Sequence, residues 1–186
     1  DFIAKASVVA IGPGLGLDDW AMTLFEQVFQ SNLPMVVDAD ALNILSLKPR
    51  KRKNWILTPH PGEAARLIDL TTPRVQSDRL GSLKKLSDSF SGTIVLKGNN
   101  TLIGSSNDMP YLITVGNPGM ASAGMGDLLT GIIAGLLGQF KDIDQGLVSA
   151  VAAYIHGSSG DLAAEQGERG LIATDLFRHL QQCLNP

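Results

Sequence analysis

The sequence predicts an α/β fold with an open, mainly parallel sheet flanked by helices. Short apolar runs, each the length of a buried strand, recur at residues 7–11, 34–38, 55–58 and 93–97. Segments with helical spacing separate these runs, and strands that alternate with helices favour a parallel sheet. Because no internal repeat, low-complexity tract or linker interrupts the 186 residues, we predict one domain over residues 1–186.

The segments between these strands have the features of helices and of one hairpin. Trp20, Leu24 and Val28, with Phe25 as a further candidate, are spaced to face the core from one helix. Pro61 is well placed to begin another, because a proline at the first helical position gives up an N–H that has no partner there. Helices are predicted over 18–30, around 42–45, from Pro61, and over 75–90, 125–138, 145–165 and 174–183, with a hairpin of strands 101–104 and 111–115 closed by SSNDMP.

The composition argues against several classes of protein. A net charge of −3 without a basic block argues against a nucleic-acid surface. No apolar run reaches about 18 residues without Gly or polar breaks, so we expect no membrane span. Cys183 is the only cysteine, which excludes an internal disulfide and fits a reducing, cytoplasmic location. The chain starts at Asp1 in the approach to a strand, which indicates a fragment of a longer protein.

Glycines follow the first predicted strand in the sequence GPGLG, residues 12–16. With Asp38 ending the next strand, they mimic a dinucleotide-binding fingerprint, but Leu17 stands where G-x-G-x-x-G requires glycine. Glycines let a ligand approach the main chain, and the next helix N-terminus favours anions. A plain tight turn explains the same residues, so both interpretations stay open.

Two prolines bracket His60 in the sequence TPHPGE, at the carboxyl end of a predicted strand. Open α/β sheets bind ligands at that edge, and the fixed proline φ angles orient the imidazole. We predict a ligand contact rather than metal ligation, since His156 and His179 form no ligand spacing with His60. The alternative is a stiff loop in which His60 caps the following helix.

Lys97 ends the last of the four buried strands and is followed by Gly98. A lysine in this position can contact a phosphate group. Taken alone the signal is weak, because lysines at strand ends are common and mostly solvated.

The most informative stretch is GNPGMASAGMGDLLTGIIAGLLG, residues 116–138. A glycine-rich loop feeds its N–H groups into the start of an apolar helix, which is an anion-binding arrangement. It is not a Walker A loop, because Met125 stands where the lysine must be. As a partner of the helix dipole Asp127 contributes only ~0.3–1 kcal/mol, whereas a base beside bound phosphate also explains the glycines. The small face predicted to pack closely consists of Gly131, Gly135 and Gly138.

GMGD before an apolar helix resembles the G-x-G-D motif of the ribokinase-like superfamily. VVAIGPGLG, VVDADALN, LTPHPGEAARL, VLKGNNT and GNPGMASAGMGD occur in this order. Together they resemble the ADP/ATP-dependent NAD(P)H-hydrate dehydratases, most of all the bacterial bifunctional form, in which an epimerase domain comes first. The resemblance implies a ribokinase-like three-layer α/β/α fold. It also implies that the chain is the C-terminal two-thirds of a dehydratase domain, with the N-terminal strands missing.

The resemblance further implies an enzyme that returns the S epimer of hydrated NADH or NADPH to the normal cofactor. ADP or ATP phosphorylates the hydroxyl, phosphate leaves, and AMP or ADP is released. The order is reasonable, because hydroxide is a poor leaving group and a phosphate ester a good one. Mg²⁺ would neutralise phosphate charge, although no carboxylate cluster marks a metal site held by the protein. The family also implies a homo-oligomer, with a tetramer as the expected state.

Carried over by motif, Gly16, His60 and Asp127 would contact the hydrated dinucleotide, and Asp127 would accept the hydroxyl proton. The residues around the nucleotide and its phosphates would be Lys97, Gly98, Asn99, Asn100, Thr101, Asn117, Gly119, Gly124, Met125 and Gly126. For Asn99 and Asn100 only main-chain contacts are implied.

Two alternatives remain at this stage. One is a kinase of a small alcohol, of the thiazole or hydroxymethylpyrimidine type, on the same fold, although the TPHPGE and GPGLG segments argue against it. The other is a nucleotide-binding fragment without catalytic activity.

Overall fold

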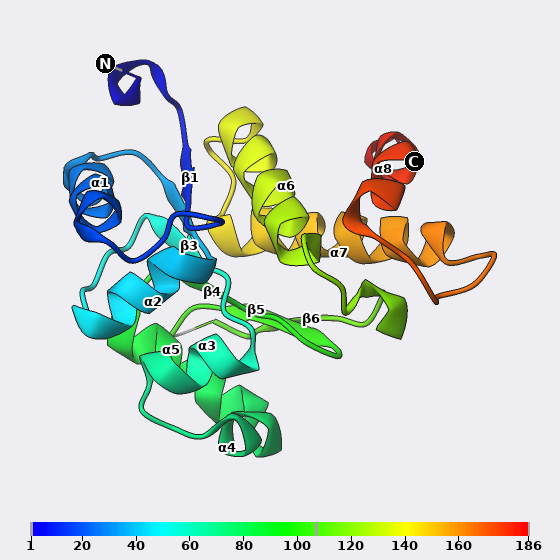
Figure 1. Cartoon of the computed structure of the whole chain (residues 1–186), viewed down its shortest axis with the longest axis horizontal. Helices are drawn as coiled ribbons and strands as arrows, with labels where there is room; N and C mark the ends of the chain where they lie inside the picture. Colours follow the sequence, from blue (N-terminus) through cyan, green and yellow to red (C-terminus); the bar gives the residue numbers. More distant parts are fainter. Residues whose placement is uncertain (1, 107, 186) are drawn as a thin grey trace.

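The computed structural model describes residues 2–106 and 108–185. Within these residues six strands form one open sheet in the order β1-β2-β3-β4-β5-β6 (Figure 1). β1 to β4 pair in parallel, and β5 and β6 add an antiparallel hairpin at one edge. The strands are β1 (Val9–Ile11), β2 (Met35–Val37), β3 (Trp55–Leu57), β4 (Thr93–Leu96), β5 (Thr101–Gly104) and β6 (Tyr111–Ile113). The predicted mainly parallel sheet and hairpin are therefore confirmed; the predicted turn includes position 107, which lies outside the described residues.

Helices cover both faces of this sheet. One set connects the parallel strands, and because these connections run in sequential order with the usual right-handed crossover, they lie on one face. This set comprises α1 (Asp19–Gln30), α2 (Ala39–Leu47), α3 (Pro61–Leu67), α4 (Thr72–Ser77) and α5 (Arg79–Phe90). The other face carries α6 (Met125–Gln139), α7 (Gln145–Ala163) and α8 (Phe177–Leu184), as Figure 1 shows. Three short 3₁₀ turns complete the described elements: η1 (Ile3–Lys5), η2 (Pro118–Met120) and η3 (Ala173–Leu176).

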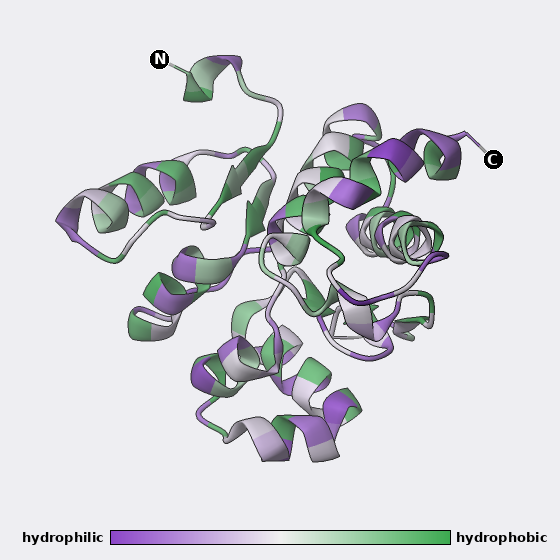
Figure 2. Ribbon diagram, turned by 45° about the vertical axis from the view of Figure 1, so that its right-hand side comes forward, coloured by the Kyte–Doolittle hydropathy of each residue, from purple (hydrophilic) through white to green (hydrophobic). Residues whose placement is uncertain are grey.

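Side chains of the central strands alternate between two cores. Met35, Val37 and Leu57 pack with α1 to α5, whereas Val36 and Ile56 pack with α6 and α7. Both cores are apolar, so the strand residues are buried whichever way they point, and the strands read as continuous apolar runs. Many of the helices carry both hydrophobic and hydrophilic residues (Figure 2), as expected for helices with one side against a sheet. The three-layer α/β/α prediction is confirmed.

Two predictions about the helices that connect the strands are wrong. The helix predicted over 75–90 is two helices, because Asp78 ends α4 and its side chain accepts a hydrogen bond from the Gly81 N–H, starting α5 anew. Trp20 was predicted to face the core but is 65% exposed. Val28 is buried as predicted, and together with Ala21 and Phe25 it forms the buried face of α1.

The glycines of α6 do not form the predicted packing face. A Cβ added at Gly131, Gly135 or Gly138 would meet no described atom within 4 Å. Close packing occurs on α7, where a Cβ on Gly157 would lie 2.8 Å from the Val115 carbonyl oxygen and one on Gly160 would lie 2.2 Å from Met120 Sδ. These α7 glycines let the loop before α6 lie against the helix.

No helix in the described part of the chain is both long enough and apolar enough to cross a membrane.

Candidate active site

A cavity of about 900 Å³ lies at the carboxyl ends of the parallel strands, where open α/β sheets bind ligands. Its walls are the ends of β2, β3 and β4, the start of α3, the loops after β4 and β6, the first turn of α6, and α7. Many of its residues come from the predicted motifs: His60, Lys97, Gly98, Asn99, Asn100, Thr101, Asn117, Met125, Gly126 and Asp127 all line it. The topology thus brings segments that are distant in sequence to one hollow.

Three predicted site residues do not line this cavity. Gly16 lies outside it, and its N–H donates to Asp40 Oδ2 at 2.8 Å. Gly119 and Gly124 lie behind the cavity wall, in the loop that leads to α6. Gly12, in the same GPGLG segment as Gly16, is needed for packing, because a Cβ there would lie 1.7 Å from the Asp38 carbonyl oxygen.

The first turn of α6 opens onto the cavity without a side-chain cap. Gly124 precedes it in the left-handed conformation, with φ +85°, which glycine adopts without strain. Within the described chain the N–H groups of Gly126 and Asp127 have no hydrogen-bond acceptor. Asp127 is exposed and its carboxylate has no described partner. The turn therefore offers free N–H groups and one free carboxylate, the elements of an anion site with a base beside it.

His60 caps α3, as the alternative interpretation of the TPHPGE motif predicted. Its Nδ1 accepts hydrogen bonds from the N–H groups of Gly62 at 3.0 Å and Glu63 at 3.3 Å, and Glu63 Oε2 accepts from the His60 N–H at 2.7 Å. Burial lowers the pKa of His60, with Lys97 and Arg66 adding to this and Glu63 opposing it, so the ring is neutral at pH 7. The cap does not remove His60 from the site, because the ring still lines the cavity.

A partly buried ion pair lies next to the α6 N-terminus. Lys97 Nζ is 2.7 Å from Asp38 Oδ1, and Thr130 Oγ1 donates to Asp38 Oδ2 at 2.8 Å. Burial alone would raise the pKa of Asp38, which is 1% exposed, but Lys97 and the hydroxyl donors outweigh burial and lower it. Lys97 Nζ would lie 3.2 Å from a Cβ at Gly126, so this cation is next to the first turn of α6.

Arg79 shapes the loop that follows β4. Its guanidinium donates to the carbonyl oxygens of Leu96 at 3.0 Å, Lys97 at 3.4 Å and Asn100 at 3.2 Å. Gly98 has φ +138°, and a Cβ there would lie 2.6 Å from Arg79 Nη1. Arg79 therefore fixes three carbonyl groups at and beside this loop, and it requires glycine at position 98.

Asp161 holds the loop between β6 and α6 in a similar way. Its carboxylate accepts from the Gly116 N–H at 2.9 Å and from Asn117 Nδ2 at 3.0 Å. The Asn117 side-chain oxygen in turn accepts from the Gly119 N–H at 3.1 Å and starts η2. The loop is thus fixed by side chains, which is the preorganisation that anion binding requires.

Sequence reasoning missed the supporting roles of Asp38, Arg79 and Asp161. Asp38 was noticed only as part of a failed fingerprint, although an acid ending a buried strand signals a buried partner. Arg79 and Asp161 lie in ordinary helical positions and carry no local signal. Among the described residues, no group of three or more His, Cys, Asp or Glu side chains could hold a metal ion.

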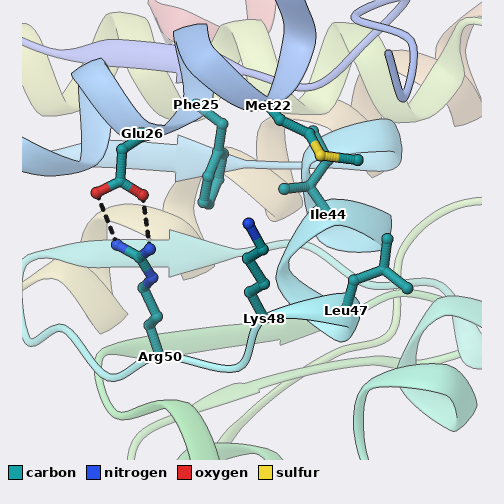
Figure 3. Close-up of a pocket in the computed structure, with 7 residues that line it drawn as sticks. All are labelled: Met22, Phe25, Glu26, Ile44, Leu47, Lys48 and Arg50. Atoms are coloured by element: carbon teal, nitrogen blue, oxygen red, sulfur yellow. Dashed lines mark hydrogen bonds and ion pairs between the residues drawn. The ribbon is translucent and has the colours of Figure 1, made fainter. Parts of the chain in front are cut away.

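A second, smaller hollow of about 50 Å³ lies between α1 and the end of α2 (Figure 3). Figure 3 shows Arg50 paired with Glu26, beside the apolar side chains of Phe25 and Ile44. The Arg50–Glu26 ion pair has an N–O distance of 2.6 Å. The hollow is too small for a nucleotide, so the cavity at the strand ends is the candidate active site.

Comparisons with known proteins show the family of the chain. A family model described as NAD(P)H-hydrate dehydratase matches residues 2–182. The bifunctional NAD(P)H-hydrate repair enzyme Nnr of Coxiella burnetii is 48% identical over 99% of this chain, and the ADP-dependent (S)-NAD(P)H-hydrate dehydratase of Neisseria meningitidis is 39% identical over 95% of it. The chain spans 38% of the first of these relatives and 63% of the second.

A solved structure shows the same likeness in three dimensions. The ADP/ATP-dependent NAD(P)H-hydrate dehydratase of Bacillus subtilis, co-crystallized with ATP/Mg²⁺, superposes with a TM-score of 0.82 at 31% identity, over 96% of this chain and 64% of that one. A hydroxyethylthiazole kinase from Pyrococcus horikoshii shares the fold, with a TM-score of 0.77, at 14% identity. From the matched family model and these relatives, the chain belongs to the NAD(P)H-hydrate dehydratase family.

Proposed function

We propose that this chain forms most of an enzyme site that uses ADP or ATP to dehydrate the S epimer of hydrated NADH or NADPH. The observation that carries the proposal is the first turn of α6, where free N–H groups and the free carboxylate of Asp127 face one large cavity. Both features are needed together when a hydroxyl group attacks a phosphate that the N–H groups hold.

The proposed chemistry has two steps. The substrate hydroxyl oxygen forms a bond to the terminal phosphorus of the nucleotide, its proton passes to Asp127, and the bond from that phosphorus to the nucleotide's bridging oxygen breaks. Phosphate then leaves the substrate carbon with the bonding electrons, and loss of a ring proton restores the double bond. Hydrated cofactor and ADP thus give cofactor, AMP, phosphate and a proton; with ATP the nucleotide product is ADP.

We assign the two ligands to two parts of the cavity. The hydrated dinucleotide would lie beside His60 and Asp127. It would extend out of the cavity to contact the loop that contains Gly16. The nucleotide would lie along the loop Lys97–Thr101 and the α6 turn, where Lys97, Met125 and Gly126 are close to its phosphates. Mg²⁺ would enter with the nucleotide and offset phosphate charge, since magnesium commonly binds through substrate phosphates and few carboxylates.

The longer protein is part of the proposal. The chain covers 38% of the bifunctional relative from Coxiella burnetii and 63% of the dehydratase relative from Neisseria meningitidis, which supports a C-terminal two-thirds of a dehydratase domain with further chain before it. We also propose a homo-oligomer, with the tetramer as the expected state, in the cytoplasm. Size-exclusion chromatography with light scattering on the full-length protein tests the oligomer.

Turnover on the full-length protein tests the function. With hydrated NADH and ADP, absorbance at the reduced-nicotinamide band should rise and AMP should form in equal amount. A small alcohol of the thiazole type should not be phosphorylated. The opposite result, with phosphorylation of the alcohol and no change in absorbance, would contradict the dehydratase proposal and favour a small-alcohol kinase.

A further inference from the structure

One side chain at the cavity has no role in the site described so far. His156 lies on α7 and lines the cavity behind the first turn of α6. Its Nε2 is buried and has no hydrogen-bond partner among the described residues. Ser122 Oγ, in the loop before α6, is also buried, unpartnered and part of the same wall. Buried polar atoms without partners are uncommon, and two of them at one cavity indicate that a ligand completes the site.

The hydrogen bond of the other ring nitrogen, Nδ1, determines whether His156 Nε2 is a donor or an acceptor. His156 makes a hydrogen bond with the Met125 main chain that favours the protonated ring, so the main-chain partner is the carbonyl oxygen. Since Nε2 has no partner, Nδ1 is the donor in this bond. Burial, with a smaller contribution from the charge of Lys97, nevertheless lowers the pKa of His156 to about 4, so the ring is neutral at pH 7. A neutral ring that donates through Nδ1 presents a lone pair at Nε2.

A lone pair selects its partner by chemistry. It repels the oxygen atoms of a phosphate group, so the anionic part of a nucleotide cannot satisfy Nε2. It accepts from an O–H or N–H group, which a nucleotide carries only on its sugar and base at neutral pH. We infer that His156 Nε2 accepts a hydrogen bond from a sugar hydroxyl or a base N–H of the bound nucleotide, so that His156 recognises the nucleoside. The inference rests on the proposed function, because it requires a nucleotide in this cavity.

Binding of matched ligands tests this role. Titration calorimetry on the full-length protein would compare ADP with inorganic pyrophosphate, which has the phosphates without the nucleoside. His156→Phe keeps a ring of similar size and removes the acceptor. It should weaken ADP binding about tenfold, as expected for one hydrogen bond to a buried acceptor, and leave pyrophosphate binding unchanged. His179→Phe, on α8 outside the cavity, is the matched control and should change neither.

Three analogues separate sugar from base. 2′-Deoxy-ADP and 3′-deoxy-ADP each lack one sugar hydroxyl, and inosine diphosphate lacks the exocyclic amine. The analogue that lacks the donor should bind the unaltered protein about tenfold more weakly than ADP, and should bind His156→Phe with the same affinity as ADP does.

Several results would overturn the inference. Equal loss of ADP and pyrophosphate affinity in His156→Phe would mean that His156 acts only by holding the Met125 carbonyl. Unchanged ADP affinity would mean that a water molecule satisfies Nε2. If His156→Phe fails to fold by circular dichroism, His156→Met, which is apolar and more adaptable, takes its place with the same expected results. Absence of ADP binding to the unaltered protein would instead contradict the proposed function.

Discussion

The helices α3 and α6 begin at the same cavity with opposite kinds of N-terminus. Each has an acid at its third position, Glu63 in α3 and Asp127 in α6. In α3 the His60 ring accepts from the first free N–H groups, and Glu63 turns back to accept from the His60 N–H. In α6 Gly124 supplies no side chain, the N–H groups stay free, and Asp127 is exposed.

The difference shows how the capping of a helix N-terminus decides whether its N–H groups stabilise the fold or remain available to a ligand. A capped N-terminus satisfies its own donors and fixes its cap residue in one orientation, which suits a side chain that must contact a substrate. An uncapped N-terminus is less stable alone, but its donors are available to an anion. The two starts thus place a fixed imidazole and an uncapped helix N-terminus in the wall of one cavity.

The largest effect is expected from Asp127→Asn. Asn is nearly isosteric and leaves the N–H groups of α6 in place, but it cannot accept the hydroxyl proton. Turnover should fall by ~10²- to 10⁴-fold, while ADP affinity is kept or slightly increased. Asp19→Asn, which changes an acid in the first turn of α1, is the control and should keep full turnover. An Asp127→Asn variant with more than about a third of the original turnover would leave Asp127 as a dipole partner only.

Gly126→Val tests the open helix start next. The φ angle of Gly126 is not positive, so the expected effect is steric: a branched side chain would cover the N–H groups of the turn and crowd Lys97 Nζ, 3.2 Å from the new Cβ. We expect ADP affinity to fall at least about thirtyfold, roughly 2 kcal/mol. Gly131→Val makes the same change on the same helix, where the described chain leaves open space, and should leave ADP affinity unchanged. Equal ADP affinity in both variants would remove the anion-site interpretation.

His156, which forms a hydrogen bond with the Met125 main chain at the start of α6, should make the free energy of unfolding depend on pH. The pKa of His156 is lowered to about 4 by burial, below its unfolded value, so the unfolded chain binds the proton first as pH falls. Stability from the neutral ring is present above about pH 6.5 and is lost toward pH 4. Between pH 7 and pH 5 the free energy of unfolding should fall by about 2 kcal/mol more in the original chain than in His156→Phe. Parallel urea midpoints for the two proteins across this range would contradict the buried neutral ring.

Most of the sheet and half of the contrast between the two helices could be predicted from the sequence. The buried strands are continuous apolar runs in the sequence. The GMGD motif predicts an uncapped helix start, because a glycine at the N-cap has no side chain to accept a hydrogen bond. The break between α4 and α5 at Asp78 could not be predicted, because the residues before and after Asp78 both have helical spacing. The exposure of Trp20 depends on which face of α1 the sheet covers, and the residues of α1 alone do not determine that face. Arg79 and His156 act across more than fifteen residues of sequence, so only the tertiary fold reveals them.

The smallest effect is expected at the capped start, and it separates the two roles of His60. His60→Ala removes both the ring and the cap, whereas His60→Asn removes the ring but keeps a side-chain acceptor suited to the N-cap. Both variants should weaken binding of the hydrated dinucleotide about tenfold and leave ADP affinity unchanged, because the nucleotide lies on the α6 side. Only His60→Ala should also lose about 1 kcal/mol of unfolding free energy. If His60→Asn binds the hydrated dinucleotide as well as the original protein does, the cap is the whole function of His60. The contrast would then lie between a structural helix start at α3 and a catalytic one at α6.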